Sequence, residues 1–133
     1  MKSVLIIDDE PVILDVLQRI LSRLGFDTTV ANSGKTALKI FAREPFDLVL
    51  LDICMPDSTG FEIAKWIKET RPAQKIVVVT AIDKNTAIIQ CNDEGIDGVL
   101  PKPFTFEMVK SVVEKTLNGE KIFKQEEIGC YNW

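Results

Sequence analysis

Apolar residues follow two alternating patterns along the chain. Short, nearly continuous apolar runs occur at 4–7, 48–51, 76–79 and 98–100, each bounded by polar or turn residues. Such runs predict strands that are buried on both faces. A fifth stretch, 26–31, is more polar and alternates, which is typical of an edge strand.

Between these runs the apolar residues recur at helical spacing and predict helices over 11–24, 34–43, 59–69, 84–94 and 105–118. Pro11 suits the first turn of the first helix, and Gly25 suits its end. A strand followed by a helix, five times over with short connections, predicts an α/β fold. We expect a single doubly wound, five-stranded parallel sheet with helices on both faces.

The runs at 4–7, 48–51 and 76–79 are the most apolar, so we place them in the middle of the sheet. The other two strands then lie at the edges, which gives the strand order 2-1-3-4-5. In this order the chain changes winding direction between strands 1 and 3, and open α/β sheets bind ligands at such a point.

One domain is expected over 1–118, followed by a C-terminal tail over 119–133 that lacks a helical stripe. The last predicted helix is apolar over more than half of its circumference. Its main face has Phe106, Val109, Val113 and Leu117, and Met108 and Val112 widen the arc. One buried face does not need that width, so we expect the excess to be a partner or dimer surface. Cover by the tail is the alternative.

Composition excludes several classes. The chain is 46% hydrophobic and 27% charged, as in soluble globular proteins, and its net charge of −4 without a basic run argues against direct nucleic-acid binding. Three cysteines and no histidine disfavour both a disulfide framework and a zinc site. No apolar run is long enough for a signal peptide or a membrane span, so we expect a cytoplasmic protein.

Polar residues with phosphate or metal chemistry follow the predicted strands. Asp8 and Asp9 follow the first strand, Asp52 the third, Thr80 the fourth and Lys102 the fifth. Parallel strands bring these residues to one edge of the sheet, where clustered carboxylates repel one another unless a cation lies among them. An all-oxygen ligand set favours Mg²⁺. We expect Asp52 to be the acid most exposed to the crevice, able to attack phosphorus and form an aspartyl phosphate.

Simpler interpretations exist for the same residues. Asp8 and Asp9 could cap the first helix, although one acid would suffice for that. For Cys54, a small buried side chain is favoured over a redox sensor.

The chain resembles a response-regulator receiver domain, the phosphoacceptor of a two-component system, with its chemotaxis-regulator-like, flavodoxin-like fold. The resemblance covers residues 3–118 in family order and spacing. The matching pieces are Asp8-Asp9, Asp52 with Met55-Pro56 and Gly60, Thr80-Ala81, and Lys102-Pro103-Phe104.

The resemblance implies a role for each residue. Asp52 would take a phosphoryl group from the phosphohistidine of a histidine kinase or a phosphotransfer protein. Asp9, Asp52 and the Cys54 backbone carbonyl would bind Mg²⁺ directly, with Asp8 acting through a water. Lys102 and Thr80 would bind the phosphoryl oxygens, and the Lys102–Pro103 bond would be cis. The change would reach a downstream protein, or a second copy of the chain, through the face made by helix 4, strand 5 and helix 5.

Three positions depart from the family pattern. Val99 stands where the family usually has Tyr or Phe, three residues before the lysine. Cys54 and Ile82 stand two residues after Asp52 and Thr80, where side chains flank the water that attacks the phosphoaspartate. Neither can hold that water as an acid or amide would, so we expect slow autodephosphorylation.

We therefore expect a stand-alone signalling module that catalyses only its own phosphorylation and dephosphorylation. The competing class is a haloacid-dehalogenase-like phosphohydrolase with Asp52 as nucleophile. That family needs a second Asp two residues on, where this chain has Cys54. A flavin-binding module is a third option, but it would need a phosphate loop rich in Ser, Thr and Gly after the first strand.

Overall fold

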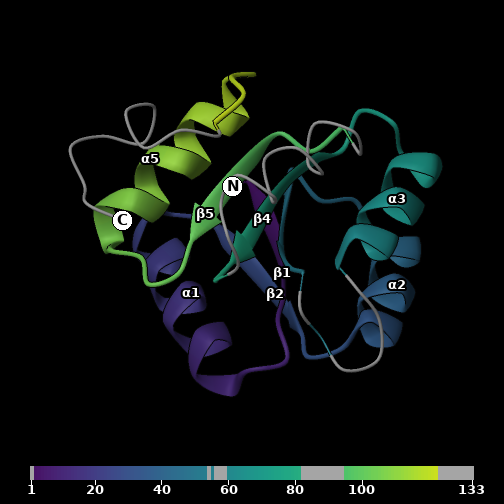
Figure 1. Cartoon of the computed structure of the whole chain (residues 1–133), viewed down its shortest axis with the longest axis horizontal. Helices are drawn as coiled ribbons and strands as arrows, with labels where there is room; N and C mark the ends of the chain where they lie inside the picture. The colour runs from purple at the N-terminus through teal and green to yellow at the C-terminus, as the bar shows by residue number, and fades with distance from the viewer. Residues whose placement is uncertain (1, 54, 56–59, 82–94, 123–133) are drawn as a thin grey trace.

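The computed structural model describes residues 2–53, 55, 60–81 and 95–122. Its five strands form one parallel sheet in the order β2-β1-β3-β4-β5, which confirms the predicted topology (Figure 1). The strands are β1 Ser3–Ile7, β2 Asp27–Ala31, β3 Leu48–Asp52, β4 Lys75–Thr80 and β5 Gly98–Pro101.

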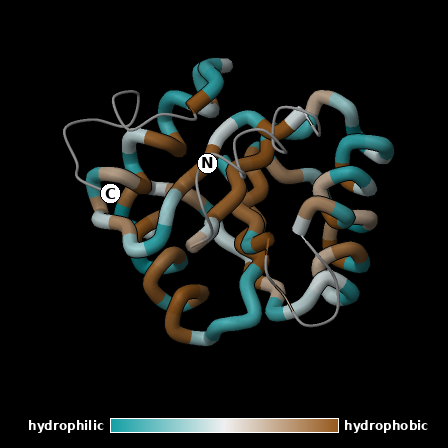
Figure 2. The backbone as a smooth tube through the Cα atoms, in the orientation of Figure 1, coloured by the Kyte–Doolittle hydropathy of each residue, from teal (hydrophilic) through white to brown (hydrophobic). Residues whose placement is uncertain are grey.

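The three most apolar strands lie in the middle of the sheet, as predicted. Every residue of β3 is buried, and β1 and β4 are buried except for an intermediate first residue. Figure 2 shows these strands as a hydrophobic band through the centre of the molecule. β2 is only partly buried, in keeping with its position at the edge.

The described helices agree closely with the predicted ones. They are α1 Pro11–Arg23, α2 Gly34–Arg43, α3 Gly60–Thr70 and α5 Phe106–Leu117. Pro11 is the first residue of α1, and Gly25 follows its end at φ +91°, a conformation that glycine adopts without strain. The hydroxyls of Ser33 and Thr105 accept backbone N–H groups at the starts of α2 and α5. The helix predicted over 84–94 lies outside the described residues.

Helices cover both faces of the sheet. α1 and α5 pack on one face, around a cluster that includes Leu17, Leu21, Val109 and Val113. α2 and α3 pack on the other face, around a cluster that includes Phe41 and Ile67. Figure 1 shows these two pairs of helices on opposite sides of the strands. Both clusters hold the strands in a fixed register, so the strand ends are rigidly placed.

The expectation that the wide apolar arc of α5 faces a partner is wrong for the two residues that widen it. Met108 and Val112 are buried inside this chain, in the same cluster as Ile122. The Ile122 side chain comes from the stretch predicted to be tail and lies against α5 and the sheet. The arc is wide because α5 packs on the sheet and also against the chain that follows it.

Candidate functional site

Acidic residues at the carboxyl ends of β1 and β3 and a lysine at the carboxyl end of β5 lie at one edge of the sheet. Asp8 directly follows β1, Asp52 is the last residue of β3, and Lys102 directly follows β5. β1 and β3 are paired neighbours, so the winding direction changes between them. The site therefore lies where ligands bind in open α/β sheets.

Lys102 lies among three carboxylates. Its Nζ is 3.2 Å from Asp8 Oδ2, 3.4 Å from Glu10 Oε1 and 3.8 Å from Asp52 Oδ2. The Asp8 and Asp52 side chains are only 1% and 5% exposed, whereas that of Glu10 is 60% exposed. The short, buried contact to Asp8 is the strongest of the three, because little water screens it.

The pKa of Lys102 is raised above its ordinary value. Burial alone would lower this pKa, but the negative charges of Asp8, Asp52 and Glu10 and the hydrogen bond to Asp8 outweigh burial. The side chain is therefore an ammonium ion at neutral pH, able to hold an anionic oxygen.

Four acids gather in the crevice. One carboxylate oxygen from each of Asp8, Asp9, Glu10 and Asp52 lies within 4.8 Å of the others. One ammonium cannot neutralise four carboxylates, and an all-oxygen donor set of this kind fits a hard divalent cation such as Mg²⁺. Glu10 is a member that the sequence reasoning left out of the candidate site. Its place directly after Asp8 and Asp9 was the available signal.

The prediction that Asp52 is the most exposed acid is wrong. Asp52 is buried, Asp9 is half-buried and Glu10 is exposed. The Asp52 carboxylate lies at the end of a fully buried strand, beside the Lys102 ammonium and the neighbouring acids. The start of α3, at Gly60, packs directly on the backbone at this end of β3. A Cβ built on Gly60 would lie 2.5 Å from both the Asp52 carbonyl oxygen and the Ile53 Cα. Only glycine allows this approach, which covers the backbone of the acid.

The capping interpretation of Asp8 does not hold. The N-cap of α1 is Glu10, and no side chain caps its first turn. Asp8 Oδ1 instead accepts the Glu10 backbone N–H at 2.9 Å, and Asp8 Oδ2 faces Lys102. Both oxygens of Asp8 are thus held in place, and they shape the crevice rather than the helix.

Thr80 and Lys102 are joined through the backbone. Thr80 is the buried last residue of β4 and pairs with Pro101 in the sheet, one position beyond the pair of Asp52 with Val79. The Lys102 N–H donates to the Thr80 carbonyl at 2.8 Å, and the Lys102–Pro103 bond is cis as expected. Cys54 and Ile82 lie outside the described residues. Their roles stay predictions.

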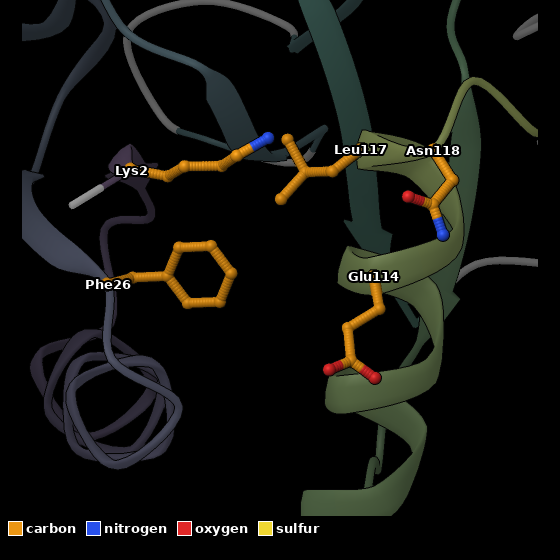
Figure 3. A pocket seen from close by; sticks show the side chains of 5 residues that line it. All are labelled: Lys2, Phe26, Glu114, Leu117 and Asn118. Carbon is orange, nitrogen blue, oxygen red and sulfur yellow. The ribbon is translucent and has the colours of Figure 1, made fainter.

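A second hollow lies far from the acids. It is lined by Lys2, Phe26, Glu114, Leu117 and Asn118 (Figure 3). Lys2 and Phe26 precede β1 and β2, so this groove is at the amino ends of the strands, opposite the acid crevice.

Among the described residues, no helix combines the length and apolarity that crossing a membrane requires.

Comparisons with known proteins point to one family. The model of the response regulator receiver domain matches residues 4–114. The response regulator protein PilR of Pseudomonas aeruginosa is 34% identical over 116 residues, which are 87% of this chain and 26% of PilR. The chain spans about a quarter to a half of the length of the curated relatives it matches.

Solved structures agree in fold and length. The CheY-like receiver domain of Methanospirillum hungatei has a TM-score of 0.85 at 28% identity, covering 90% of this chain and 95% of that one. The response regulator TrrA of Thermotoga maritima, solved in complex with Mg²⁺ and BeF, has a TM-score of 0.80 at 34% identity. It covers 87% of this chain and 99% of its own. These matches do not favour a haloacid-dehalogenase-like enzyme, and the chain belongs to the response regulator receiver domains, the phosphoacceptor modules of two-component signalling.

Proposed function

We propose that Asp52 is the phosphoacceptor and takes its phosphoryl group from the phosphohistidine of a sensor histidine kinase or a phosphotransfer protein. One observation carries this proposal. The Asp52 carboxylate ends a central strand, 3.8 Å from the Lys102 ammonium and within 4.8 Å of three further acids. A nucleophilic oxygen, a cation and a metal-binding oxygen set therefore surround a single point.

The transfer is a displacement at phosphorus. An Asp52 carboxylate oxygen forms a bond to phosphorus as the phosphorus–nitrogen bond of the donor breaks. The imidazole leaves with the bonding electron pair and takes up a proton as neutral histidine. Lys102 moves its positive charge from Asp8 and Glu10 toward the phosphoryl oxygens, and the Thr80 hydroxyl donates to one of them.

Mg²⁺ is the implied cofactor, and the donor set fits it. Asp9, Asp52 and the Cys54 backbone carbonyl would hold the ion, with Asp8 acting through a water. When bound, the ion neutralises the acids and the developing charge of the phosphoryl oxygens. Burial of Asp8 and Asp52 strengthens these interactions, because little water competes for the same oxygens.

The donor would approach over the start of α1. Val12 and Val16 are the large apolar side chains that are exposed among the described residues, and they lie one turn apart on α1. The helix begins directly after Glu10, at the acid crevice. An apolar patch beside a charged crevice fits a protein donor that packs on α1 while its phosphohistidine reaches Asp52.

Output would pass through the face formed by the helix predicted over 84–94, β5 and α5. Its recipient would be a downstream protein or a second copy of this chain. Direct contact with nucleic acid is disfavoured by the net charge of −4. The curated relatives are longer than this chain. The activity of any output domain that acts with this chain is therefore a proposal.

Acetyl phosphate tests the proposal without a cognate kinase. In Mg²⁺ buffer, intact mass spectrometry should show one added phosphoryl group on the chain and none on Asp52→Asn. Asp15→Asn, on the exposed surface of α1, is the matched control and should label normally. Chelation of Mg²⁺ should abolish labelling. Labelling of Asp52→Asn, or steady hydrolysis of acetyl phosphate without a stable adduct, would refute the proposal; the second result would support a phosphohydrolase.

A further inference from the structure

The chain does not leave the domain at the end of α5. Gly119 follows the helix at φ +91°, and the Gly119 and Glu120 N–H groups donate back to the carbonyls of Thr116 and Lys115. These bonds end α5 as glycine does in helix C-caps. The next residues run back along the sheet, and we call residues 120–122 the C-terminal strap.

The strap pairs with the outer edge of β5. The Ile122 N–H donates to the Asp97 carbonyl at 2.9 Å, and the Val99 N–H donates to the Ile122 carbonyl at 2.8 Å. Ile122 forms a parallel bridge with Gly98 and is 1% exposed. The strap thus acts as a one-residue sixth strand on the edge strand of the sheet.

Asp97 anchors the strap from inside the molecule. This buried carboxylate accepts the Ile76 backbone N–H at 2.9 Å, and its other oxygen lies 2.9 Å from Lys121 Nζ. Lys68 of α3 lies 3.6 Å away. The ion pair to Lys121 is partly exposed and so contributes little by itself, but it fixes the strap next to the two backbone bonds.

The strapped arrangement also carries costs. A Cβ on Gly98 would lie 3.1 Å from the Ile122 carbonyl oxygen, so a larger residue would require the strap to shift slightly. The buried Thr116 hydroxyl has no hydrogen-bond partner among the described residues. A buried hydroxyl without a hydrogen-bond partner is destabilising. Release of the strap would let water reach this group.

The pairing cannot lengthen far along β5. Successive residues of a strand direct their N–H groups to opposite sides, and the Val99 N–H points outward to the strap. The next outward position is Pro101, which has no N–H to donate. The strap is therefore held to β5 by a single bridge.

β5 connects the strap to the acid crevice. It has four residues, Gly98–Pro101, with the strap on its first half and Lys102 directly after its end. Lys102 also bonds the Thr80 carbonyl through its backbone. A move of Lys102 or Thr80 toward a phosphoryl group therefore acts on the same short strand that holds Ile122.

We propose that the strap is a regulated cover of the β5 edge, and that phosphorylation at the acid crevice weakens its pairing with β5. The proposal rests on the proposed function of Asp52. It adds a covering element to the output face.

Hydrogen exchange at the Val99 amide measures the strap directly, because the partner of that amide is the Ile122 carbonyl. By nuclear magnetic resonance, this amide should be protected in the full chain without phosphate analogue. Gly98→Ala should speed its exchange by about tenfold or more and Lys121→Met by a few-fold, while Leu50 in β3 stays unchanged. Lys110→Met, an exposed lysine of α5, is the matched control and should leave Val99 protected.

Beryllofluoride with Mg²⁺ tests the coupling to the crevice. Saturation with the analogue should speed Val99 exchange by about tenfold, and by reciprocity Lys121→Met should bind the analogue more tightly, by up to the same factor. Val99 exchange at the rate of an exposed amide in the free protein would refute the strap. Unchanged Val99 exchange in the analogue-bound protein would refute the coupling. Failure of the analogue to bind at all would instead count against the role of Asp52.

Discussion

Lys102 is the residue whose charge holds the acid crevice together in the absence of metal. Its ammonium lies between the buried carboxylates of Asp8 and Asp52. Without Lys102, these two buried carboxylates would lose the positive charge that lies between them. Removing one partner of a buried charge group typically costs about 3–5 kcal/mol, far more than the loss of an exposed pair.

Lys102→Met should therefore lower the free energy of unfolding by about 3 kcal/mol in metal-free buffer. The deficit should shrink with Mg²⁺, which supplies the missing positive charge. Urea unfolding followed by circular dichroism measures both effects. Lys102→Arg keeps the charge and should lose less.

The matched control is Arg19→Met. Its ion pair with Asp15 is largely exposed and should contribute less than about 0.5 kcal/mol. If Lys102→Met is as stable as the original chain in metal-free buffer, the ammonium does not hold the acids, and the site must be neutralised by other means.

We expect two further residues to set the lifetime of the phosphorylated state. By the family resemblance, Cys54 and Ile82 flank the water that attacks phosphoaspartate, and neither side chain can orient it. Cys54→Asn and Ile82→Glu should each shorten the lifetime of the phosphoryl group by about tenfold, which is less than the full effect of a positioned general base. The decay of phosphorylated protein after removal of acetyl phosphate gives the rate. Cys91→Ser should leave it unchanged, and an unchanged or longer lifetime in both test variants would refute this role.

At the scale of elements, the start of α3 positions the phosphoacceptor. Gly60 lies against the Asp52 carbonyl and the Ile53 Cα, and the Gly60 N–H donates to the Ile53 carbonyl at 3.1 Å. The helix therefore fixes the end of β3 through backbone atoms. These atoms cannot move aside as a flexible side chain can.

Gly60→Ala should lower stability by about 1–3 kcal/mol through overpacking, and should also slow phosphorylation by acetyl phosphate, because the end of β3 must shift. Gly25→Ala is the control: it introduces strain at φ +91°, but a Cβ there meets no atom within 4 Å. It should lower stability by about 1–2 kcal/mol and leave the rate of phosphorylation per folded molecule unchanged. Equal rates in both variants would show that Gly60 serves packing alone.

The elements themselves were predictable because their periods differ. Apolar runs such as 48–51 and the helical stripe of α1 specify strands and helices locally, and the greater polarity of 26–31 marks an edge. The gathering of Asp8, Asp9 and Asp52 followed from strand order. The close packing of α3 on the end of β3 did not, because it depends on a contact of Gly60 with backbone seven and eight residues before it in the chain.

The environment of α5 was incompletely predicted for a different reason. Its wide apolar arc was noticed, but the arc alone does not say what covers it. The cover includes Ile122, whose stretch has no apolar period from which to predict pairing. The backbone bonds of Val99 and Asp97 that fix Ile122 depend on the edge of the finished sheet.

At the scale of the whole molecule, the buried apolar residues that the structure describes form two clusters, one on each face of the sheet. Phe41, Ile63 and Ile67 belong to the face of α2 and α3, and Val109 and Val113 to the face of α1 and α5. The strands are shared by both clusters, with alternate residues facing each. We therefore expect the domain to unfold as one cooperative unit.

Trp66 tests this expectation, because it reports on one face while a substitution acts on the other. It belongs to α3, and its ring lies 6.0 Å from that of Phe41. In a Trp133→Phe background, Val113→Ala on α5 should lower the free energy of unfolding by about 2 kcal/mol. The Trp66 fluorescence transition and the far-ultraviolet circular dichroism transition should move together. If α5 and its cluster unfold separately, the circular dichroism transition splits and the Trp66 midpoint stays in place. Signal transfer from the crevice to the face of β5 and α5 would then arise from local unfolding of that layer rather than from movement within one rigid sheet.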